Sequence, residues 1–341
     1  MPELIGDIKK STMYTPPTSS GTWQRAWTAR IMLKETLLRL KSELRYNMIA
    51  LFQKSLPNRK LIYRKRVSHP ANFFSVMTRI KNEARFLPEF IAHHKLIGAE
   101  HFYFYDNNSN DDPEAVLKPF IDRGLATIIP WKTVPASPSC YCDFFDKFAS
   151  ESKWVAFIDA DEFIVERRRG LLINVLSTLN RSPALAINYR YFGSSFHETV
   201  PTGLVTNNFL YSDPSTDSHV KVVAKPECVK GYYNTHNFIF EALASAVNYT
   251  GRRVRGTYSV KADQCDIEIS HYVYRSKDNY LSKLAIGFGD MEGYKSRARR
   301  KDRVESEFLT HNTFFNDWVS NTYGADIRDY MSVIGYKEPY I

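Results

Sequence analysis

The sequence predicts an α/β fold with a mostly parallel central sheet flanked by helices. Apolar, strand-like runs alternate with helix-like segments between residues 73 and 158, which is the pattern of βαβ units. Several of these strands end in acidic or polar residues, as expected where parallel strands reach the ligand-binding edge of a sheet. With 341 residues, 43% of them hydrophobic, the chain is long enough to bury one large core.

The first 66 residues predict a basic arm that precedes this body. They contain 14 Lys and Arg against 4 Asp and Glu, whereas the rest of the chain contains 32 against 33. From Thr22 to about Phe52, apolar residues recur at near-helical spacing among Arg and Lys, which predicts a basic amphipathic helix or helix pair. Two interpretations stay open: the helix packs on the body or on a neighbouring domain, or it lies on an anionic membrane surface.

The predicted body covers residues 67–290 and begins with regular alternation. Its first four strands are expected at residues 73–80, 101–105, 126–129 and 154–158. Helices are expected between them at residues 84–96, 113–123 and 141–150. Shorter, mixed strands are expected at residues 184–192, 204–211, 220–224 and 258–261. The chain is expected to be helical from residue 277, with residues 291–341 as a helical C-terminal extension.

Composition also bears on location and partners. The sequence has no run of roughly 18 apolar residues and no signal-peptide core, which predicts a cytoplasmic chain, or one bound peripherally to the inner face of a membrane. A luminal catalytic fragment trimmed of its anchor is the alternative, because it would have the same composition. The four cysteines are too few and too scattered for a disulfide framework and are expected to be reduced thiols. Because the body is nearly neutral, no nucleic-acid partner is expected.

The most informative motif is the segment 154–163, WVAFIDADEF, in which an apolar run ends in Asp159, Asp161 and Glu162. A strand buried on both faces cannot continue into uncompensated negative charge, so these carboxylates are expected at its C-terminal end. Asp159 and Asp161 offer hard oxygen ligands for Mn²⁺ or Mg²⁺, which can carry a phosphorylated substrate.

Glu83 and Asp106 follow the first and second predicted strands. In a parallel sheet they converge on the same edge as Asp159, where a carboxylate can accept hydrogen bonds from a base or a ribose. The alternative is turn and cap chemistry, which is the preferred interpretation for Asp111 and Asp112.

Several blocks, in this order along the chain, resemble glycosyltransferase family 92 and its family 2-like relatives of GT-A fold. They include RIKNEARFLPEFIAHH at 79–94, HFYFYDNNS at 101–109 and the segment 154–163, with later blocks at residues 192–195, 220–226 and 271–276. The resemblance implies a GT-A-like fold and a metal-dependent, inverting glycosyltransferase. It would move a sugar from a nucleotide-sugar donor, UDP-linked, to a glycan, polysaccharide or glycolipid.

The resemblance also implies where the nucleotide lies. Lys81, Asn82 and Glu83 would lie by the base and Asp106 by the nucleoside. Asp159 would lie at both the ribose and the metal.

For the metal and the diphosphate, the resemblance implies that Asp161 and Asp159 bind the ion and that His271 completes its ligand set. Lys221 and Lys283 would contact diphosphate oxygens. Relatives often have Arg-Gly shortly after the position of Lys283, where this chain has Ile-Gly. That contact is therefore either missing or supplied from elsewhere, for example by Arg275.

An inverting transfer needs a general base for the acceptor hydroxyl. The sequence offers Glu198 and Asp290 as candidates, while Glu162 is expected to steady the site from behind.

Two other functions remain as alternatives. A phosphotransferase of the haloacid dehalogenase type also uses Asp-x-Asp after a strand, but there the motif follows the first strand, whereas here it follows the fourth. A non-catalytic protein that binds a membrane or a polyanion through a GT-A scaffold would explain the basic arm and the basic run at residues 295–303.

Overall fold

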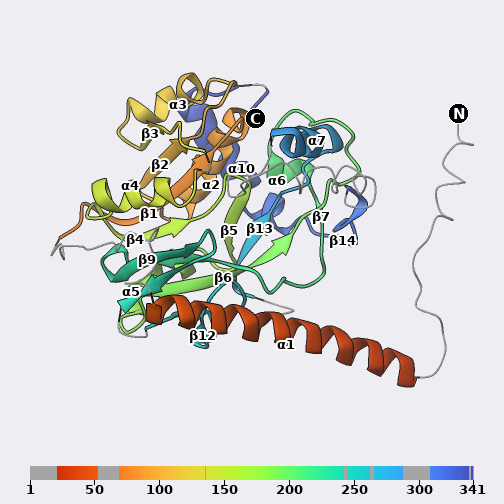
Figure 1. Cartoon of the computed structure of the whole chain (residues 1–341). Coiled ribbons are helices and arrows are strands. Elements are labelled where there is room, and N and C mark those ends of the chain that lie inside the picture. Colours follow the sequence, from red (N-terminus) through yellow and green to blue (C-terminus); the bar gives the residue numbers. More distant parts are fainter. Residues whose placement is uncertain are drawn as a thin grey trace, which may run out of the picture.

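The computed structural model describes residues 21–52, 69–134, 136–241, 244–261, 265–286, 308–337 and 339–340. Its centre is a large sheet with helices on both faces (Figure 1). Along the main path the strands are β12 (Arg253–Val254), β11 (Ala246–Asn248), β6 (Ala184–Tyr191), β8 (Val220–Ala224), β4 (Ser152–Phe157), β1 (Asn72–Ile80), β2 (His101–Asp106) and β3 (Ala126–Pro130).

Most of the neighbouring strands in the centre of this sheet are parallel. β1 pairs in parallel with β2 and β4, β2 with β3, and β11 with β6. The exceptions are β8, which runs antiparallel to both β4 and β6, and the edge strand β12, which runs antiparallel to β11. The predicted α/β class with a mostly parallel sheet is therefore confirmed.

A second set of strands branches from β6. β13 (Ile267–His271) pairs in parallel with β6 and antiparallel with β5 (Glu162–Glu166), which follows β4 in the chain. Among the described residues there are also two small pairs: β9 (Val229–Asn234) with β10 (Asn237–Phe240), and β7 (Tyr211–Ser212) with β14 (Phe314–Phe315).

Helices cover both faces of the sheet. A large apolar core lies beneath α2 (Leu87–Leu96), α3 (Pro113–Ile121), α5 (Leu171–Thr178) and α10 (Trp318–Ile334). A second core lies on the other face, beneath α4 (Ser139–Lys147) and the β9–β10 pair. The remaining helices of the described residues are η3 (Ala84–Phe86), α6 (Val205–Asn208), η4 (Pro226–Cys228), α7 (Lys277–Ile286) and α1 (Gly21–Phe52).

The central strands are apolar on both sides because each side faces one of these cores. In β4, Trp154 and Ala156 point into the first core, while Val155 and Phe157 point into the second. This alternation follows from the two-residue period of a strand. It explains why the sequence of β4 is a continuous apolar run, and why the prediction of the first four strands is confirmed.

The predicted strand at residues 204–211 is wrong, because its first half is the short helix α6. The buried carboxylate of Glu89, on α2, accepts hydrogen bonds from the backbone N–H of Val205 at 2.6 Å and of Thr206 at 2.9 Å, and from the Thr206 hydroxyl at 2.8 Å. These bonds satisfy the unpaired donors at the start of a helix. The capping group comes from a distant part of the sequence, so the local pattern does not reveal it.

The predicted strand at residues 258–261 is also wrong, since only Tyr258 forms an isolated bridge, to His219. The predicted helical structure from residue 277 is found in α7 and α10, but Phe314–Phe315 of the predicted helical extension form the strand β14. Residues 287–307 lie outside the described part of the chain.

The N-terminal helix α1 packs on the body through its C-terminal half. The Ser42 hydroxyl accepts a hydrogen bond from the Thr257 N–H at 3.0 Å, and the Tyr46 and Tyr233 rings lie 5.3 Å apart. Gly256 has a φ of +85°, and a Cβ atom there would lie 2.3 Å from the Ser42 hydroxyl oxygen. Only glycine tolerates both conditions. None of the described helices combines the length and apolar composition that a bilayer span requires.

Two buried histidines fasten α2 to β5. The His94 Nδ1–H donates to the Phe90 carbonyl at 2.8 Å, so its Nε2 is the acceptor for the Ile164 N–H at 3.2 Å. The His93 Nε2–H donates to the Ile164 carbonyl at 2.7 Å. Burial lowers the pKa of His93 to about 4 and holds the pKa of His94 well below its usual range.

These histidines predict a loss of stability in mild acid. The unfolded imidazoles bind protons as pH falls through about 6.5, whereas the folded ones resist protonation until lower pH. His93 alone should contribute about 3 kcal/mol above pH 6.5, lost progressively as pH falls toward 4. Denaturant unfolding at pH 7.5, 6 and 5 measures this loss. His93→Gln should reduce the pH dependence, and His69→Gln, at an exposed position, should not. Equal stability at pH 7.5 and pH 5 would contradict the argument.

Candidate active site

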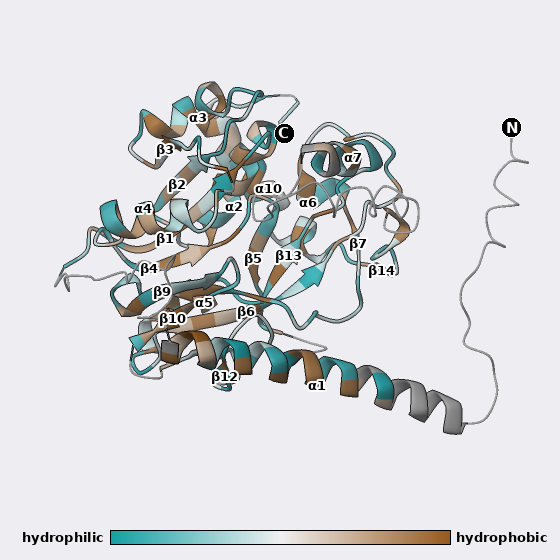
Figure 2. Cartoon of the chain, in the orientation of Figure 1, coloured by the Kyte–Doolittle hydropathy of each residue, from teal (hydrophilic) through white to brown (hydrophobic). Residues whose placement is uncertain are grey.

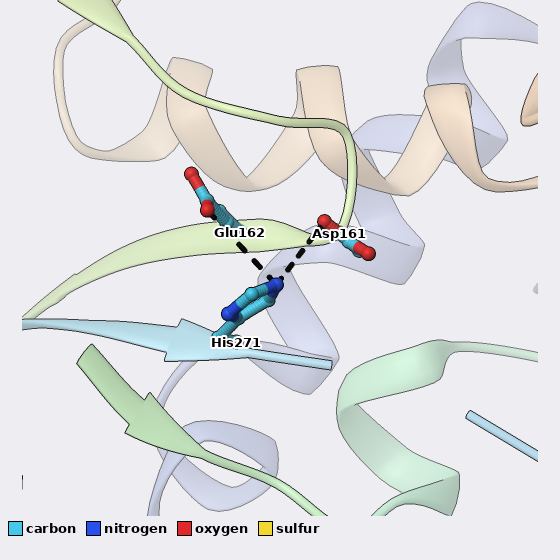
Figure 3. A group of neighbouring side chains, drawn as sticks. All are labelled: Asp161, Glu162 and His271. Atoms are coloured by element: carbon cyan, nitrogen blue, oxygen red, sulfur yellow. Dashed lines mark ion pairs between the residues drawn. The ribbon is translucent and has the colours of Figure 1, made fainter. Parts of the chain in front are cut away.

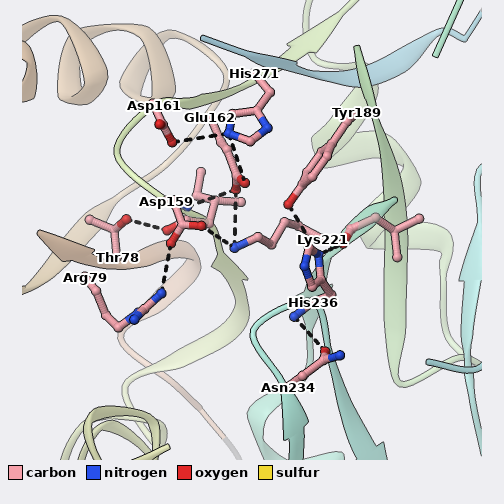
Figure 4. Close-up of polar contacts among 12 residues, drawn as sticks. Thr78, Arg79, Asp159, Asp161, Glu162, Tyr189, Lys221, Asn234, His236 and His271 are labelled. Atoms are coloured by element: carbon pink, nitrogen blue, oxygen red, sulfur yellow. Dashed lines mark hydrogen bonds and ion pairs between the residues drawn. The ribbon is translucent and has the colours of Figure 1, made fainter. Parts of the chain in front are cut away.

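The acidic motif forms a corner between two strands that belong to different parts of the sheet. β4 pairs with β1 and β8, whereas β5 pairs with β13, so the chain turns between Phe157 and Glu162. The Asp159 N–H donates to Glu162 Oε2 at 2.9 Å, and the Glu162 N–H donates to the Asp159 carbonyl at 3.0 Å. The Tyr272 N–H donates to the Asp161 carbonyl at 2.8 Å. These bonds fix the backbone of the corner, and the first of them also orients the Glu162 carboxylate (Figure 4).

Asp159 lies between two cations supplied by the strands on either side of β4. Lys221 Nζ, from β8, is 2.7 Å from Asp159 Oδ2, and Arg79 Nη2, from the end of β1, is 3.5 Å from Oδ1. Although burial alone would raise it, the pKa of Asp159 is lowered to about 2 by Lys221 and then Arg79. Asp159 is therefore ionised at neutral pH and engaged in ion pairs, with its side chain 34% exposed.

Asp161, Glu162 and His271 form a candidate metal centre (Figure 3). His271 Nε2 lies 3.5 Å from Asp161 Oδ1 and 3.9 Å from Glu162 Oε1, and one ligand atom from each residue lies within 4.8 Å of the others. Within the described part of the chain, Glu162 Oε1 is buried and accepts no hydrogen bond. Two carboxylates and an imidazole suit Mn²⁺, so these residues fit the predicted ion.

The register between β5 and β13 brings these ligands together. It places His271 directly opposite Glu162. β13 is held in turn by the buried pair of Arg190 and Glu268, with Nε 2.7 Å from Oε1 and Nη2 2.9 Å from Oε2. Neither strand was expected from the sequence, so the position of His271 beside Glu162 was not foreseeable.

The structure rearranges the predicted ligand set of Asp159, Asp161 and His271. It brings Asp161 and His271 together, adds Glu162 to them, and places Asp159 beside them in ion pairs. Glu162 was expected only to steady the site. Burial raises its pKa to about 7, and the neighbouring Asp159 acts in the same direction while Lys221 opposes it. Burial makes the ionised form of this carboxyl unfavourable when no cation is near, and a bound metal ion would stabilise that ionised form.

Lys283 and Glu83 contact each other beside Asp161. Lys283 Nζ, from α7, lies 2.6 Å from Asp161 Oδ2 and 3.2 Å from Glu83 Oε1. Arg275 Nη1 lies 2.7 Å from Glu83 Oε2, and its fully buried guanidinium carbon is 3.7 Å from the centre of the Phe86 ring. Lys283 and Lys221 hold the pKa of their carboxylate partners low, and Arg275 adds a third cation nearby.

Asn82 and Asp106 tie the loops after β1 and β2 together. Asn82 has a φ of +56°, its N–H donates to the Ser109 hydroxyl at 2.9 Å, and its side-chain oxygen accepts from the Asn110 N–H at 2.8 Å. Asp106 Oδ1 accepts from the Ser109 N–H at 3.1 Å. Lys81, beside Asn82, is partly exposed at this edge. The turn chemistry that was the alternative for Asp106 is therefore present.

Asp111 and Asp112 have the turn and cap contacts preferred for them. Asp112 accepts a hydrogen bond from the Ala115 N–H at 3.1 Å and caps α3, and Asp111 accepts from the Ala84 N–H at 2.8 Å. Asp111 thus holds the loop after β2 against η3.

The candidate bases from the sequence gain no contact with this cluster among the described residues. The Glu198 side chain is 67% exposed and lies 3.4 Å from Lys277 Nζ. Asp290 lies outside the described residues.

The structure adds an imidazole and carboxylate pair that the sequence did not reveal. His311 Nδ1 lies 2.7 Å from Asp213 Oδ2. The His311 ring stacks on Tyr191 at 4.9 Å, and Tyr191 lies 5.2 Å from the His271 ring. Because 98 residues separate the pair in the chain, no local motif marks it.

The model of glycosyltransferase family 92 matches residues 76–280. A family 92 protein of Ricinus communis is 29% identical over 241 residues, covering 67% of the chain and 41% of that relative. One from Oryza sativa subsp. japonica is 26% identical over 289 residues, covering 82% and 47%. The chain thus spans less than half the length of these curated relatives.

Among solved structures, residues 1–349 of Staphylococcus aureus TarS align with 74% of the chain and 73% of their own length. The sequences are 16% identical and the TM-score is 0.36.

The geometry predicts which carboxylates bind Mn²⁺. Asp161→Asn, Glu162→Gln and His271→Ala each remove a ligand and should weaken Mn²⁺ binding by more than roughly 100-fold. Asp159→Asn alters a neighbouring group and should cost roughly 10 to 100-fold. Isothermal titration with MnCl₂ measures these affinities, with the exposed Glu114→Gln as the matched control. If Asp159→Asn abolishes binding and Glu162→Gln does not, the ligand set predicted from the sequence is the right one.

Proposed function

The chain belongs to glycosyltransferase family 92, and on that premise we propose that it is a metal-dependent, inverting glycosyltransferase. It would transfer a sugar from a nucleotide-sugar donor, UDP-linked, to a hydroxyl of a glycan, polysaccharide or glycolipid. The observation that carries this proposal is the cluster of Asp161, Glu162 and His271 with Lys283 against it. Family membership removes the basis for the haloacid dehalogenase alternative.

The donor half of the proposed site is built from ligands and cations. Asp161, Glu162 and His271 would hold Mn²⁺, which when bound stabilises the negative charge of the departing diphosphate. Lys283, 2.6 Å from Asp161, is placed to add a second positive charge to the same oxygens. Lys221 keeps Asp159 ionised, so that Asp159 can accept a hydrogen bond from a ribose hydroxyl.

The nucleoside is proposed at the edge where β1, β2 and β4 end. These strands are parallel, so Lys81, Asn82 and Glu83 after β1, and Asp106 at the end of β2, leave the sheet on the side of Asp159. Open α/β sheets bind their ligands at this edge. Glu83 connects the two regions, because it contacts Lys283, which also contacts Asp161.

For the acceptor half we propose His311 as the general base, ahead of Glu198 and Asp290. With Asp213 accepting the Nδ1 proton, Nε2 is the basic nitrogen of the ring, and the carboxylate stabilises the imidazolium that forms. The acceptor hydroxyl would give its proton to Nε2 as its oxygen bonds to the anomeric carbon. The bond from that carbon to the diphosphate breaks, and the diphosphate leaves with the electron pair.

A thermal-shift panel tests the donor. UDP-, GDP-, CMP- and dTDP-sugars are each added with and without Mn²⁺, and a UDP-sugar should stabilise the chain only when Mn²⁺ is present. At 100 times its dissociation constant, a ligand adds about 2.7 kcal/mol. Asp161→Ala should abolish the shift, whereas Glu114→Gln should retain it. The proposal fails if no nucleotide sugar binds, or if Asp161→Ala leaves the shift intact.

The base is tested with the donor that the panel identifies, by following release of UDP. His311→Gln should lower kcat by roughly 10² to 10⁴-fold, the usual contribution of a general base, and should leave the donor-induced thermal shift unchanged. Glu198→Gln is the matched comparison and should retain kcat. The reverse result, with kcat lost in Glu198→Gln and kept in His311→Gln, would assign the base to Glu198.

A further inference from the structure

The helix α1 presents two different faces. The face on the body includes the buried Ser42 and Tyr46. Glu35 and Glu43 flank this face and pair with the body, Glu35 with Lys261 at 2.8 Å and Glu43 with Arg255 at 3.8 Å. The opposite face points away from the body.

An apolar stripe runs along that opposite face. Its members recur every three or four residues, which places them on one side of a helix. They are Leu33, Leu37, Leu40, Leu44, Met48 and Leu51, with exposed fractions of 60%, 47%, 47%, 63%, 61% and 70%. Figure 2 shows apolar and polar residues alternating along this helix. Large apolar side chains gathered in one exposed patch mark an interaction surface.

The charges of α1 are divided between the two faces. Arg30, Lys34, Lys41 and Arg45 are exposed, whereas the acidic residues Glu35 and Glu43 pair with the body. Each of the four basic residues lies one helical turn from a member of the stripe, so the basic row borders the apolar one. The stripe and its basic border together are called the outer face of α1.

We propose that the outer face of α1 binds the surface of an anionic lipid bilayer, with the helix axis parallel to the membrane. Leucine and methionine side chains enter the boundary of the acyl chains, while the flanking Lys and Arg contact anionic headgroups. A second copy of the chain is a poorer occupant, because pairing two outer faces would place basic rows side by side. A nucleic acid would match the charges and leave the apolar stripe uncovered.

Vesicle flotation of the full chain tests this proposal. Vesicles of phosphatidylcholine with phosphatidylglycerol should carry the protein, and vesicles of phosphatidylcholine alone should carry much less. The triple variant Lys34→Gln, Lys41→Gln, Arg45→Gln should bind anionic vesicles roughly 100-fold more weakly, since each cation near the surface contributes about a factor of 5. Leu37→Asp with Leu40→Asp and Leu44→Asp should abolish binding.

The controls separate surface binding from damage to the fold. Val333→Asp makes the same kind of change at a position on α10 that is 81% exposed and should bind vesicles like the wild type. All variants should unfold at the wild-type temperature. Wild-type binding by both triple variants overturns the proposal. So does sedimentation equilibrium that finds a dimer in the wild type and a monomer in the leucine variant, because a second copy would then cover the outer face.

Discussion

The structure depends on the neutralisation of three carboxylates at the corner between β4 and β5. Leaving ionised carboxylates unpaired in a largely buried site would cost several kcal/mol each. The compensating cations come from separate parts of the fold: Arg79 from β1, Lys221 from β8 and Lys283 from α7. The antiparallel strand β8, inserted between β4 and β6, is thus what brings Lys221 to Asp159. The order of the strands in the sheet therefore determines which cations neutralise the carboxylates of the site.

The sequence predicted features that depend on a local pattern of residues. It did not predict features that depend on contacts between segments far apart in the chain. The first four strands could be predicted because their apolar runs pack against the cores of the sheet. Asp161 and Glu83 were identified from their positions after predicted strands, and Lys221, Lys283 and His271 through the resemblance to one family. Glu162 as a ligand could not be predicted, because its role depends on the register with β13. The helix α6 is capped by Glu89, 116 residues away from Val205, and His311 is 98 residues away from Asp213. Such contacts arise only when the chain folds.

The donor half and the acceptor half of the proposed site are held by parts of the fold that differ in stability. The ligands of the donor half extend from strands of the main sheet and its β13 branch. The pair of His311 and Asp213 is positioned near the small β7–β14 pair, in which Phe314 lies opposite Ser212 and Phe315 opposite Tyr211. A two-stranded pair is only marginally stable on its own. Its position therefore depends on neighbouring contacts, such as the hydrogen bond from the Asn316 amide to the Ser212 hydroxyl at 3.1 Å.

The fit of Ser42 against Gly256 has a mechanical consequence. The helix α1 contacts the body in its C-terminal half, at Ser42 for example, and its N-terminal part extends past the body (Figure 1). A small change of angle at the contact is therefore a large displacement at the free end. At 1.5 Å per residue, its first residue lies about 30 Å from the contact at Ser42. A tilt of about 4° at the contact would displace that end by about 2 Å. A side chain at position 256 would collide with Ser42 at this contact. The absence of a side chain at Gly256 therefore helps to set the direction of α1.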